Sequence, residues 1–301
     1  MAKESGFAVE KANGGPREVT WKFKDRRIEF GERGMIMGIL NVTPDSFSDG
    51  GQFDTVDAAL RHAQAMIAEG ADIIDVGGES TRPGAAPVGE EEELERTIPV
   101  VERLRAQWEG LISIDTAKAA VAEQAMAARA DIVNDVTGLR GDQGMPEVCL
   151  ESQAGVVVMH MQGEPRTMQA APSYHDVVEE VRAFFEERFQ SLTKAGLSSE
   201  QLCFDPGIGF GKTLEHNLAL LAHLGQLIVN NRPLLVGHSR KSFIGKVLGD
   251  DSPEVREWPT VVLTAATRAQ GVHIHRVHAV RENREAMRML EAIRAPTQNT
   301  P

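Results

Sequence analysis

Short apolar runs alternate with longer amphipathic segments from residue 35 to the end of the chain. The runs are rich in Val, Ile and Leu, which is typical of parallel strands that are buried on both faces of a sheet. A segment with the apolar period of a helix follows each run. The predicted strands are 35–41, 73–76, 111–114, 132–134, 156–159, 202–205, 234–237 and 274–277, and the predicted helices are 56–68, 90–105, 118–128, 146–152, 176–195, 216–224, 261–270 and 283–293.

Eight strand-then-helix units in one chain predict an α/β fold, a closed (β/α)₈ TIM barrel. Trp21 and Phe23, which alternate with lysines, predict the first strand of a β-hairpin that closes the N-terminal end, or bottom, of the barrel. A doubly wound open sheet is the alternative, but no G-x-G-x-x-G follows the first strand. We expect one barrel domain over residues 19–295, with flexible tails at 1–18 and 296–301.

Composition limits the classes of partner. The net charge of −12 argues against non-specific binding to nucleic acid or to an acidic membrane. No apolar run is long enough to span a bilayer, and the N-terminus lacks a secretory signal pattern. Cys149 and Cys203 form no CxxC pair and indicate buried thiols in a reducing compartment. We therefore expect a cytoplasmic protein with no nucleic-acid or membrane partner.

Polar residues follow nearly every predicted strand. In a (β/α)₈ barrel the carboxyl ends of the strands meet at one rim, which carries the active site. One polar residue there is ordinary, but a full ring of them predicts a pocket. The ring consists of Asn41, Gly77, Gly78, Asp115, Asn134, Asp135, His160, Asp205, Ser239, Arg240, Lys241, Arg276 and His278.

Four of these residues suit a flat heterocycle. Asp115, Asn134, Asp205 and Lys241 combine acceptors and donors, and a buried carboxylate needs well-placed hydrogen bonds. An aminopyrimidinone ring offers adjacent N–H donors for an Asp and a carbonyl for a Lys. The alternative for Asp115 is a helix N-cap, since a predicted helix begins at residue 118.

A second group of residues suits an anion. Arg82, Arg276 and His278 can converge on phosphate oxygens, and Asn41 offers a hard oxygen ligand for Mg²⁺ shared with substrate phosphates. The segment 239–242 precedes helical sequence, so its N–H groups and a serine hydroxyl can hold a carboxylate.

Two further features leave alternatives open. His273, His275 and His278 resemble a metal site in spacing, but with no neighbouring Cys or acid they are better explained as core or surface histidines. Two rim loops, 41–51 and 77–89, are rich in Gly, Pro, Ser and Asp, as loops that close over substrate often are. Phe47 and Pro83 near their tips could clamp an aromatic ring.

Taken together, the motifs resemble the dihydropteroate synthase family over residues 35–290. The matching segments are 41–51, 75–84, 113–116, 134–135, 159–163 with 167–169, 205–212, 239–245 and 276–278. The resemblance implies a TIM barrel that condenses 6-hydroxymethyl-7,8-dihydropterin diphosphate with p-aminobenzoate in folate biosynthesis, releasing pyrophosphate. It also implies Mg²⁺ and a homodimer.

The resemblance assigns roles residue by residue. It implies that Asp115, Asn134, Asp205, Lys241, Met159 and Phe210 bind the pterin, that Thr81, Arg82, Arg276 and His278 bind the diphosphate, that Asn41 meets the metal, and that Phe47, Pro83 and Ser242 frame the p-aminobenzoate pocket. Asp115, Lys241, Arg276 and Asn41 are the expected catalytic group.

We expect a dissociative substitution without a general base, because an aniline nitrogen is already nucleophilic near neutral pH. Diphosphate leaves, Asp115 stabilises the resulting pterin cation, and the amine then attacks.

Two positions depart from the family pattern. Ala279 stands where the family usually has Asp, and Pro259-Thr260 stands where it has a Gly-Ser or Gly-Thr pair. They leave open a non-catalytic pterin-binding paralogue. A folate-dependent corrinoid methyltransferase domain is the other alternative, but it needs no diphosphate site.

Overall fold

The computed structural model describes residues 19–43, 52–80, 86–163 and 167–294, with the backbone alone for 52–54. Eight parallel strands form one sheet in the order β8-β7-β6-β5-β4-β3-β10-β9. A bridge between Phe204 and Leu234 joins β8 to the segment that enters β9 and completes the ring. The strands are β3 (Met35–Asn41), β4 (Ile73–Gly77), β5 (Leu111–Asp115), β6 (Ile132–Asp135), β7 (Gly155–Met159), β8 (Leu202–Asp205), β9 (Leu235–Val236) and β10 (Ile274–Val277). The predicted (β/α)₈ barrel is confirmed, and the open-sheet alternative is wrong because the ring closes.

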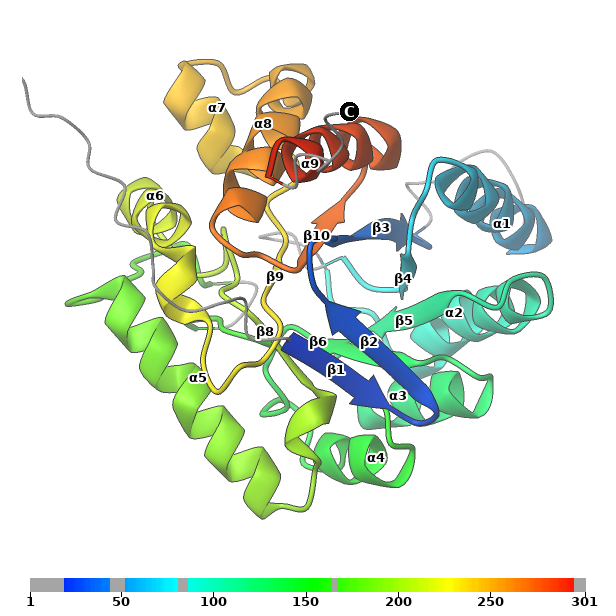
Figure 1. Ribbon diagram of the computed structural model, residues 1–301. Helices are drawn as coiled ribbons and strands as arrows, with labels where there is room; N and C mark the ends of the chain where they lie inside the picture. Colours follow the sequence, from blue (N-terminus) through cyan, green and yellow to red (C-terminus); the bar gives the residue numbers. More distant parts are fainter. Residues whose placement is uncertain (1–18, 44–51, 81–85, 164–166, 295–301) are drawn as a thin grey trace, which may run out of the picture.

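Helices surround the ring on the outside (Figure 1). They are α1 (Gln52–Ala68), α2 (Glu90–Arg105), α3 (Ala119–Ala127), α4 (Met145–Glu151), α5 (Val177–Lys194), α6 (Leu214–Ala222), α7 (Ser242–Leu248), α8 (Glu257–Ala269) and α9 (Val280–Arg294), with 3₁₀ turns η2 (Ser199–Gln201), η3 (Leu224–Leu227) and η4 (Pro253–Arg256). The strand-facing sides of the helices pack on the outer faces of the strands in one continuous apolar core, which includes the predicted buried thiol Cys149. Among the described helices, none is long and apolar enough to cross a membrane.

Several helices begin earlier than the apolar pattern indicates, namely α1, α4, α6, α8 and α9. Helix α8 starts at Glu257, four residues before the predicted start, so Pro259 lies in its first turn. Proline is tolerated there because the first N–H groups of a helix have no intrahelical acceptor. The Pro259-Thr260 pair is therefore part of α8 and does not precede it.

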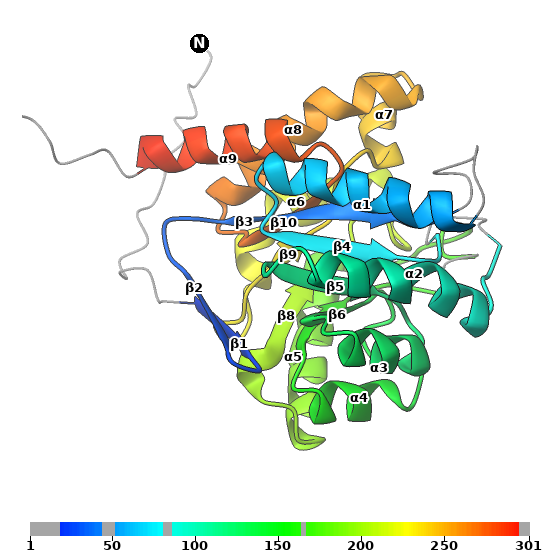
Figure 2. The same cartoon turned by 90° about the vertical axis from the view of Figure 1, so that its right-hand side faces the viewer.

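The predicted hairpin closes the bottom of the barrel (Figure 2). Strand β1 (Val19–Phe23) pairs with β2 (Arg26–Phe30), and Trp21 and Phe23 are almost fully buried. They pack on the first residues of the barrel strands in a second apolar cluster, which contains Cys203. A Cβ on Gly155 would lie 2.8 Å from the Phe23 ring, so glycine at the start of β7 admits the hairpin.

Candidate active site

The carboxyl ends of β4, β5, β6 and β10 bring four polar side chains together. Arg276 Nε donates to Asp75 Oδ2 and its Nη2 donates to Asp115 Oδ2, each at 2.6 Å. Asn134 Nδ2 donates to the same Asp75 oxygen at 3.1 Å. Asp115 and Asn134 are register partners on β5 and β6, which explains why both side chains enter the barrel from adjacent positions. One guanidinium thus bridges two buried carboxylates.

Burial in this group is electrostatically costly. Desolvation, with a smaller contribution from the nearby Asp75, raises the pKa of Asp115 to about 7 against the attraction of Arg276. Burial alone would lower the pKa of Arg276, but Asp75 and Asp115 hold it above its usual value. The alternative role of Asp115 as a helix cap is wrong, since the residue before α3 is Lys118 and the first N–H of that helix, on Ala119, donates to Asp142 at 2.9 Å.

A second group lies across the rim, on β8 and the segment after β9. Asp205 Oδ1 accepts from the Gly207 N–H at 2.8 Å, and Lys241 Nζ lies 4.0 Å over the Phe210 ring. Desolvation raises the pKa of Asp205 to about 6, opposed by that backbone hydrogen bond and by Lys241. Met159, the register partner of Asp205 on β7, joins Phe210 in a small apolar cluster.

Together the two groups hold all six predicted pterin-binding residues. Asp115, Asn134, Asp205, Met159 and Phe210 are all less than a tenth exposed. Gly237 lies between the groups, because a Cβ there would be 3.8 Å from Arg276 Cβ and 3.9 Å from Asp205 Oδ2. The donors and acceptors predicted for an aminopyrimidinone therefore share one polar, largely buried rim.

The remaining predicted residues fall into two sets. Asn41 ends β3 at the rim, Ser242 begins α7 and is exposed, and His278 follows β10 with its Nδ1 2.9 Å from the Ser239 hydroxyl. The other set lies outside the described residues and consists of Phe47, Thr81, Arg82 and Pro83.

The histidine run is distributed over different environments. His273 Nδ1 accepts from the Leu234 N–H at 3.1 Å, and His275 Nε2 lies 2.9 Å from the Thr267 hydroxyl. Both are buried, whereas His278 is half-buried at the rim. Over the described part of the chain, no three His, Cys, Asp or Glu side chains are grouped so that they could hold a metal ion.

Two charged residues of this region were missed by the sequence reasoning. Asp75 is fully buried, and its Oδ1 has no hydrogen-bond partner among the described residues. A charged residue inside an otherwise apolar strand, Ile73-Ile-Asp-Val, is the signal that could have found it. Lys212 is 2% exposed, and desolvation lowers its pKa to about 7 despite Asp205. Its position at the end of a glycine-rich loop gave no comparable signal.

Comparison with known proteins places the chain in a family. The sequence profile described as "Pterin binding enzyme" matches residues 37–278. The chain belongs to the pterin-binding enzyme family. A dihydropteroate synthase of Escherichia coli is 49% identical over 264 residues, which cover 88% of this chain and 93% of the relative. Relatives at this identity and coverage confirm the predicted class, a dihydropteroate synthase and hence a transferase of folate biosynthesis.

Solved structures agree with this assignment. Dihydropteroate synthase of Xanthomonas albilineans, solved with 4-aminobenzoic acid, has a TM-score of 0.86 and 43% identity, and the match covers 93% of this chain and 99% of that one. The enzyme of Burkholderia cenocepacia, complexed with 7,8-dihydropteroate, has a TM-score of 0.83 and 43% identity, with 92% and 97% coverage.

Proposed function

We propose that this chain condenses 6-hydroxymethyl-7,8-dihydropterin diphosphate with p-aminobenzoate to give 7,8-dihydropteroate and pyrophosphate. The observation that carries the proposal is a cluster of buried charges at one end of the barrel, where Arg276 bridges Asp75 and Asp115, Asn134 donates to Asp75, and Lys241 attracts Asp205. Such a costly set of buried charges is typical of a site that binds a polar ligand. The two relatives solved with 4-aminobenzoic acid and with 7,8-dihydropteroate support the choice of substrates.

The pterin subsite uses acceptors on two sides. Asp205 and Asn134 bind the N–H edge of the ring, Lys241 meets its carbonyl, and Met159 and Phe210 pack beside it. The cation–π contact of Lys241 with Phe210 supports this reading, because it holds the ammonium next to the apolar wall.

The diphosphate subsite is proposed around Arg276 and His278, with Thr81 and Arg82 as further binding residues on the basis of the sequence. Arg276 contacts two carboxylates, so its charge is largely neutralised. We propose that the substrate diphosphate competes with these carboxylates for the guanidinium, so that Arg276 binds the carboxylates first and the diphosphate when substrate arrives.

The residues at the rim fit Mg²⁺ only as a shared ion. Mg²⁺ at phosphates keeps water and few protein ligands, so one amide oxygen such as that of Asn41 suits this role. When bound, the ion would neutralise charge on the leaving diphosphate. The amine substrate is proposed to lie near Ser242, Phe47 and Pro83.

We propose that the C–O bond breaks before the amine attacks. Asp115, ionised and aimed from β5, stabilises the positive charge that develops on the pterin, while Arg276 stabilises the departing diphosphate. Positioning of the aniline nitrogen then completes the reaction without a general base.

Pyrophosphate release tests the reaction. Purified protein would receive the dihydropterin diphosphate with Mg²⁺, with and without p-aminobenzoate. Amine-dependent release with dihydropteroate formed is the expected result. Binding without turnover would favour the non-catalytic paralogue instead. No rise in melting temperature with pyrophosphate and Mg²⁺ would favour the corrinoid methyltransferase, which has no diphosphate site.

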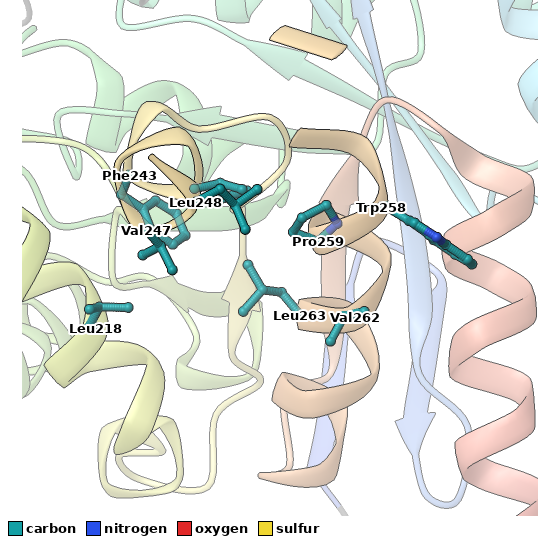
Figure 3. A pocket seen from close by; sticks show the side chains of 9 residues that line it. Leu218, Phe243, Val247, Leu248, Trp258, Pro259, Val262 and Leu263 are labelled. Carbon is teal, nitrogen blue, oxygen red and sulfur yellow. The ribbon is translucent and has the colours of Figure 1, made fainter. Parts of the chain in front are cut away.

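We also propose a homodimer, supported by an apolar surface on α6, α7 and α8. Leu218, Val247, Leu248, Trp258 and Val262 are 43–74% exposed. They border a hollow of about 350 Å³, which Figure 3 shows between side chains of the three helices. Apolar patches of this kind are typical of subunit interfaces, and a two-fold axis would cover the same patch on both copies.

Sedimentation velocity of two variants tests this surface. Val247→Glu places a charge in the patch and should give a monomer. Met289→Glu is the control, because Met289 is 66% exposed, against 56% for Val247, but lies on α9 outside the patch. A Val247→Glu protein that stays dimeric would rule out this interface.

A further inference from the structure

The loop between β8 and α6 is held by its backbone. Gly207, Gly209 and Gly211 have φ values of +64°, +83° and +60°, which favour glycine. A Cβ on Gly207 would lie 2.0 Å from the His160 carbonyl oxygen, and one on Gly211 would lie 2.3 Å from the Gln162 carbonyl oxygen. The loop therefore packs directly on the segment that follows β7.

Lys212 turns back from the end of this loop into the protein. Its Nζ donates to the Phe210 carbonyl at 2.9 Å and to the His160 carbonyl at 3.3 Å, and lies 3.1 Å from His160 Nδ1. Burial lowers the pKa of His160 to about 2, as do Lys212 and Arg140, so the imidazole is neutral and can accept a hydrogen bond. Three acceptors match the donors of one amino group.

Phe210 depends on this anchor. Its carbonyl accepts from Lys212, while its side chain belongs to a buried apolar cluster with Val136, Met159, Met161 and Met168. The side chain of Lys241 then crosses the same loop. Its Cδ is 3.1 Å from a Cβ placed on Gly209, and its Nζ is 4.0 Å from the centre of the Phe210 ring. A shift of the loop would move Phe210 and Lys241 together.

We propose that Lys212 is a positioning residue for the pterin subsite. It fixes the height of the Phe210 ring above the β7–β8 end of the barrel, and through that ring it sets the direction of Lys241. It contacts no substrate itself. The proposal rests on the pterin subsite described above. A purely structural anchor would make the same hydrogen bonds but would not govern substrate affinity.

Two variants separate these roles. Lys212→Leu removes every hydrogen bond of Nζ, and Tyr174→Phe removes the hydrogen bond, 2.9 Å long, that Tyr174 donates to the Gly211 carbonyl of the same loop. Since misplacement by about 1 Å can cost up to roughly a hundredfold in rate, we expect Lys212→Leu to raise KM for the dihydropterin diphosphate about tenfold to a hundredfold. KM for p-aminobenzoate should change less than about twofold in both variants, and Tyr174→Phe should leave both values near wild type.

Lys212→Gln tests rescue, because an amide can donate to the same carbonyls. It should recover part of the lost affinity. If all three variants lower only the melting temperature and leave both KM values unchanged, Lys212 is a structural anchor and the proposal fails.

Methyl NMR tests the geometry without turnover. With ¹³C-methyl methionine, the signals of Met159, Met161 and Met168 report the position of the Phe210 ring, because all four residues belong to one buried cluster. We expect these three signals to shift in ligand-free Lys212→Leu and to move back in Lys212→Gln, even if the proposed reaction were wrong. Unchanged methyl signals in Lys212→Leu would overturn the positioning role.

Discussion

At the bottom of the barrel, Trp21 and Phe23 of the hairpin fill the interior with aromatic carbon and cluster with apolar side chains of the barrel strands. At the top, Asp75, Asp115 and Arg276 occupy equivalent interior positions with charged groups. Burying apolar surface stabilises a fold, whereas burying charge costs free energy unless every group is paired. The bottom of the barrel therefore stabilises the fold, whereas the charged groups at the top are better explained by function.

The two ends also differ in how completely their buried polar atoms are hydrogen-bonded. The Trp21 Nε1–H donates to the Gln201 carbonyl at 2.6 Å, so the bottom aromatic has its one polar atom paired. At the top, Asp75 Oδ1 is buried and has no partner within the described residues. Substitutions at the bottom should therefore cost stability alone, whereas those at the top should cost activity, with or without a change in stability.

The largest effect is expected for Arg276→Met. The two carboxylates lose their shared cation, so kcat/KM should fall by about 10²–10³-fold and stability by about 3–5 kcal/mol. Arg284→Met is the matched control, because Arg284 pairs with Asp72 through two hydrogen bonds of 2.8 and 3.0 Å at the bottom. It should lower stability without changing kcat. Steady-state kinetics and urea unfolding would compare the two variants. A loss of kcat in Arg284→Met would contradict the division between a stabilising bottom and a catalytic top.

Trp21→Ala should have the next largest effect, on stability alone. Removing a fully buried tryptophan costs about 3–5 kcal/mol, which at this chain length lowers the melting temperature on the order of 10 °C. Lys22→Ala on the same strand is the control, since the Lys22 side chain is 51% exposed. The kcat of folded Trp21→Ala should match wild type at 20 °C. A large drop there would show that the hairpin shapes the site.

The pH profile tests the charged end. The pKa values of Asp115, about 7, and Asp205, about 6, predict that kcat/KM for the pterin substrate falls below about pH 7 and more steeply below pH 6, because the protonated carboxyls lose their charge. A flat profile from pH 5 to 8 would contradict these assignments.

The same raised pKa has an opposite consequence for stability. The pKa of Asp115 is about 7 in the folded chain and near 3.8 in the unfolded chain, so the folded chain holds the proton more tightly. The free energy of unfolding therefore falls as pH rises from about 4 through 7. Asp115→Asn should therefore stabilise the ligand-free protein more at pH 8 than at pH 5. Thermal melts at both values measure the difference.

The smallest effect is expected at Ala279. It directly precedes α9, and its carbonyl accepts from the Asn283 side chain at 2.6 Å. Ala279→Asp would supply an N-cap worth about 0.5–2 kcal/mol, with kcat changed less than about twofold. Melting temperature and kcat check this, and a large gain in kcat would mean that the alanine impairs the site.

Strand and helix patterns predicted the fold well, because in a parallel barrel the apolar positions of each strand and helix are the positions that become buried. Residues 35–41 and 202–205 were predicted with the bounds that the structure has. Helix ends were predicted less evenly, since residues 90–105 match α2 but the start of α8 was wrong. Helix α8 begins at Glu257 because a proline in a first turn is compatible with helix, which the periodicity of the apolar residues does not reveal.

At the site, the sequence predicted which strand ends carry polar residues but not their partners. The contact of Arg276 with Asp75 joins residues 201 positions apart and depends on the curvature of the sheet. Lys212 was missed for a related reason, since only the folded loop turns its side chain inward. The roles of Phe47, Thr81, Arg82 and Pro83 stay predictions from the sequence.

The most direct test of the account is the division of the Asp115→Asn defect between turnover and binding. Single-turnover kinetics would give the chemical step, and calorimetric titration with the dihydropterin diphosphate would give Kd. If Asp115 acts on the charge that develops as the C–O bond breaks, turnover falls by about 10²–10³-fold while Kd changes only a few-fold. Equal losses in rate and affinity would contradict the electrostatic role and leave Asp115 as a binding residue alone.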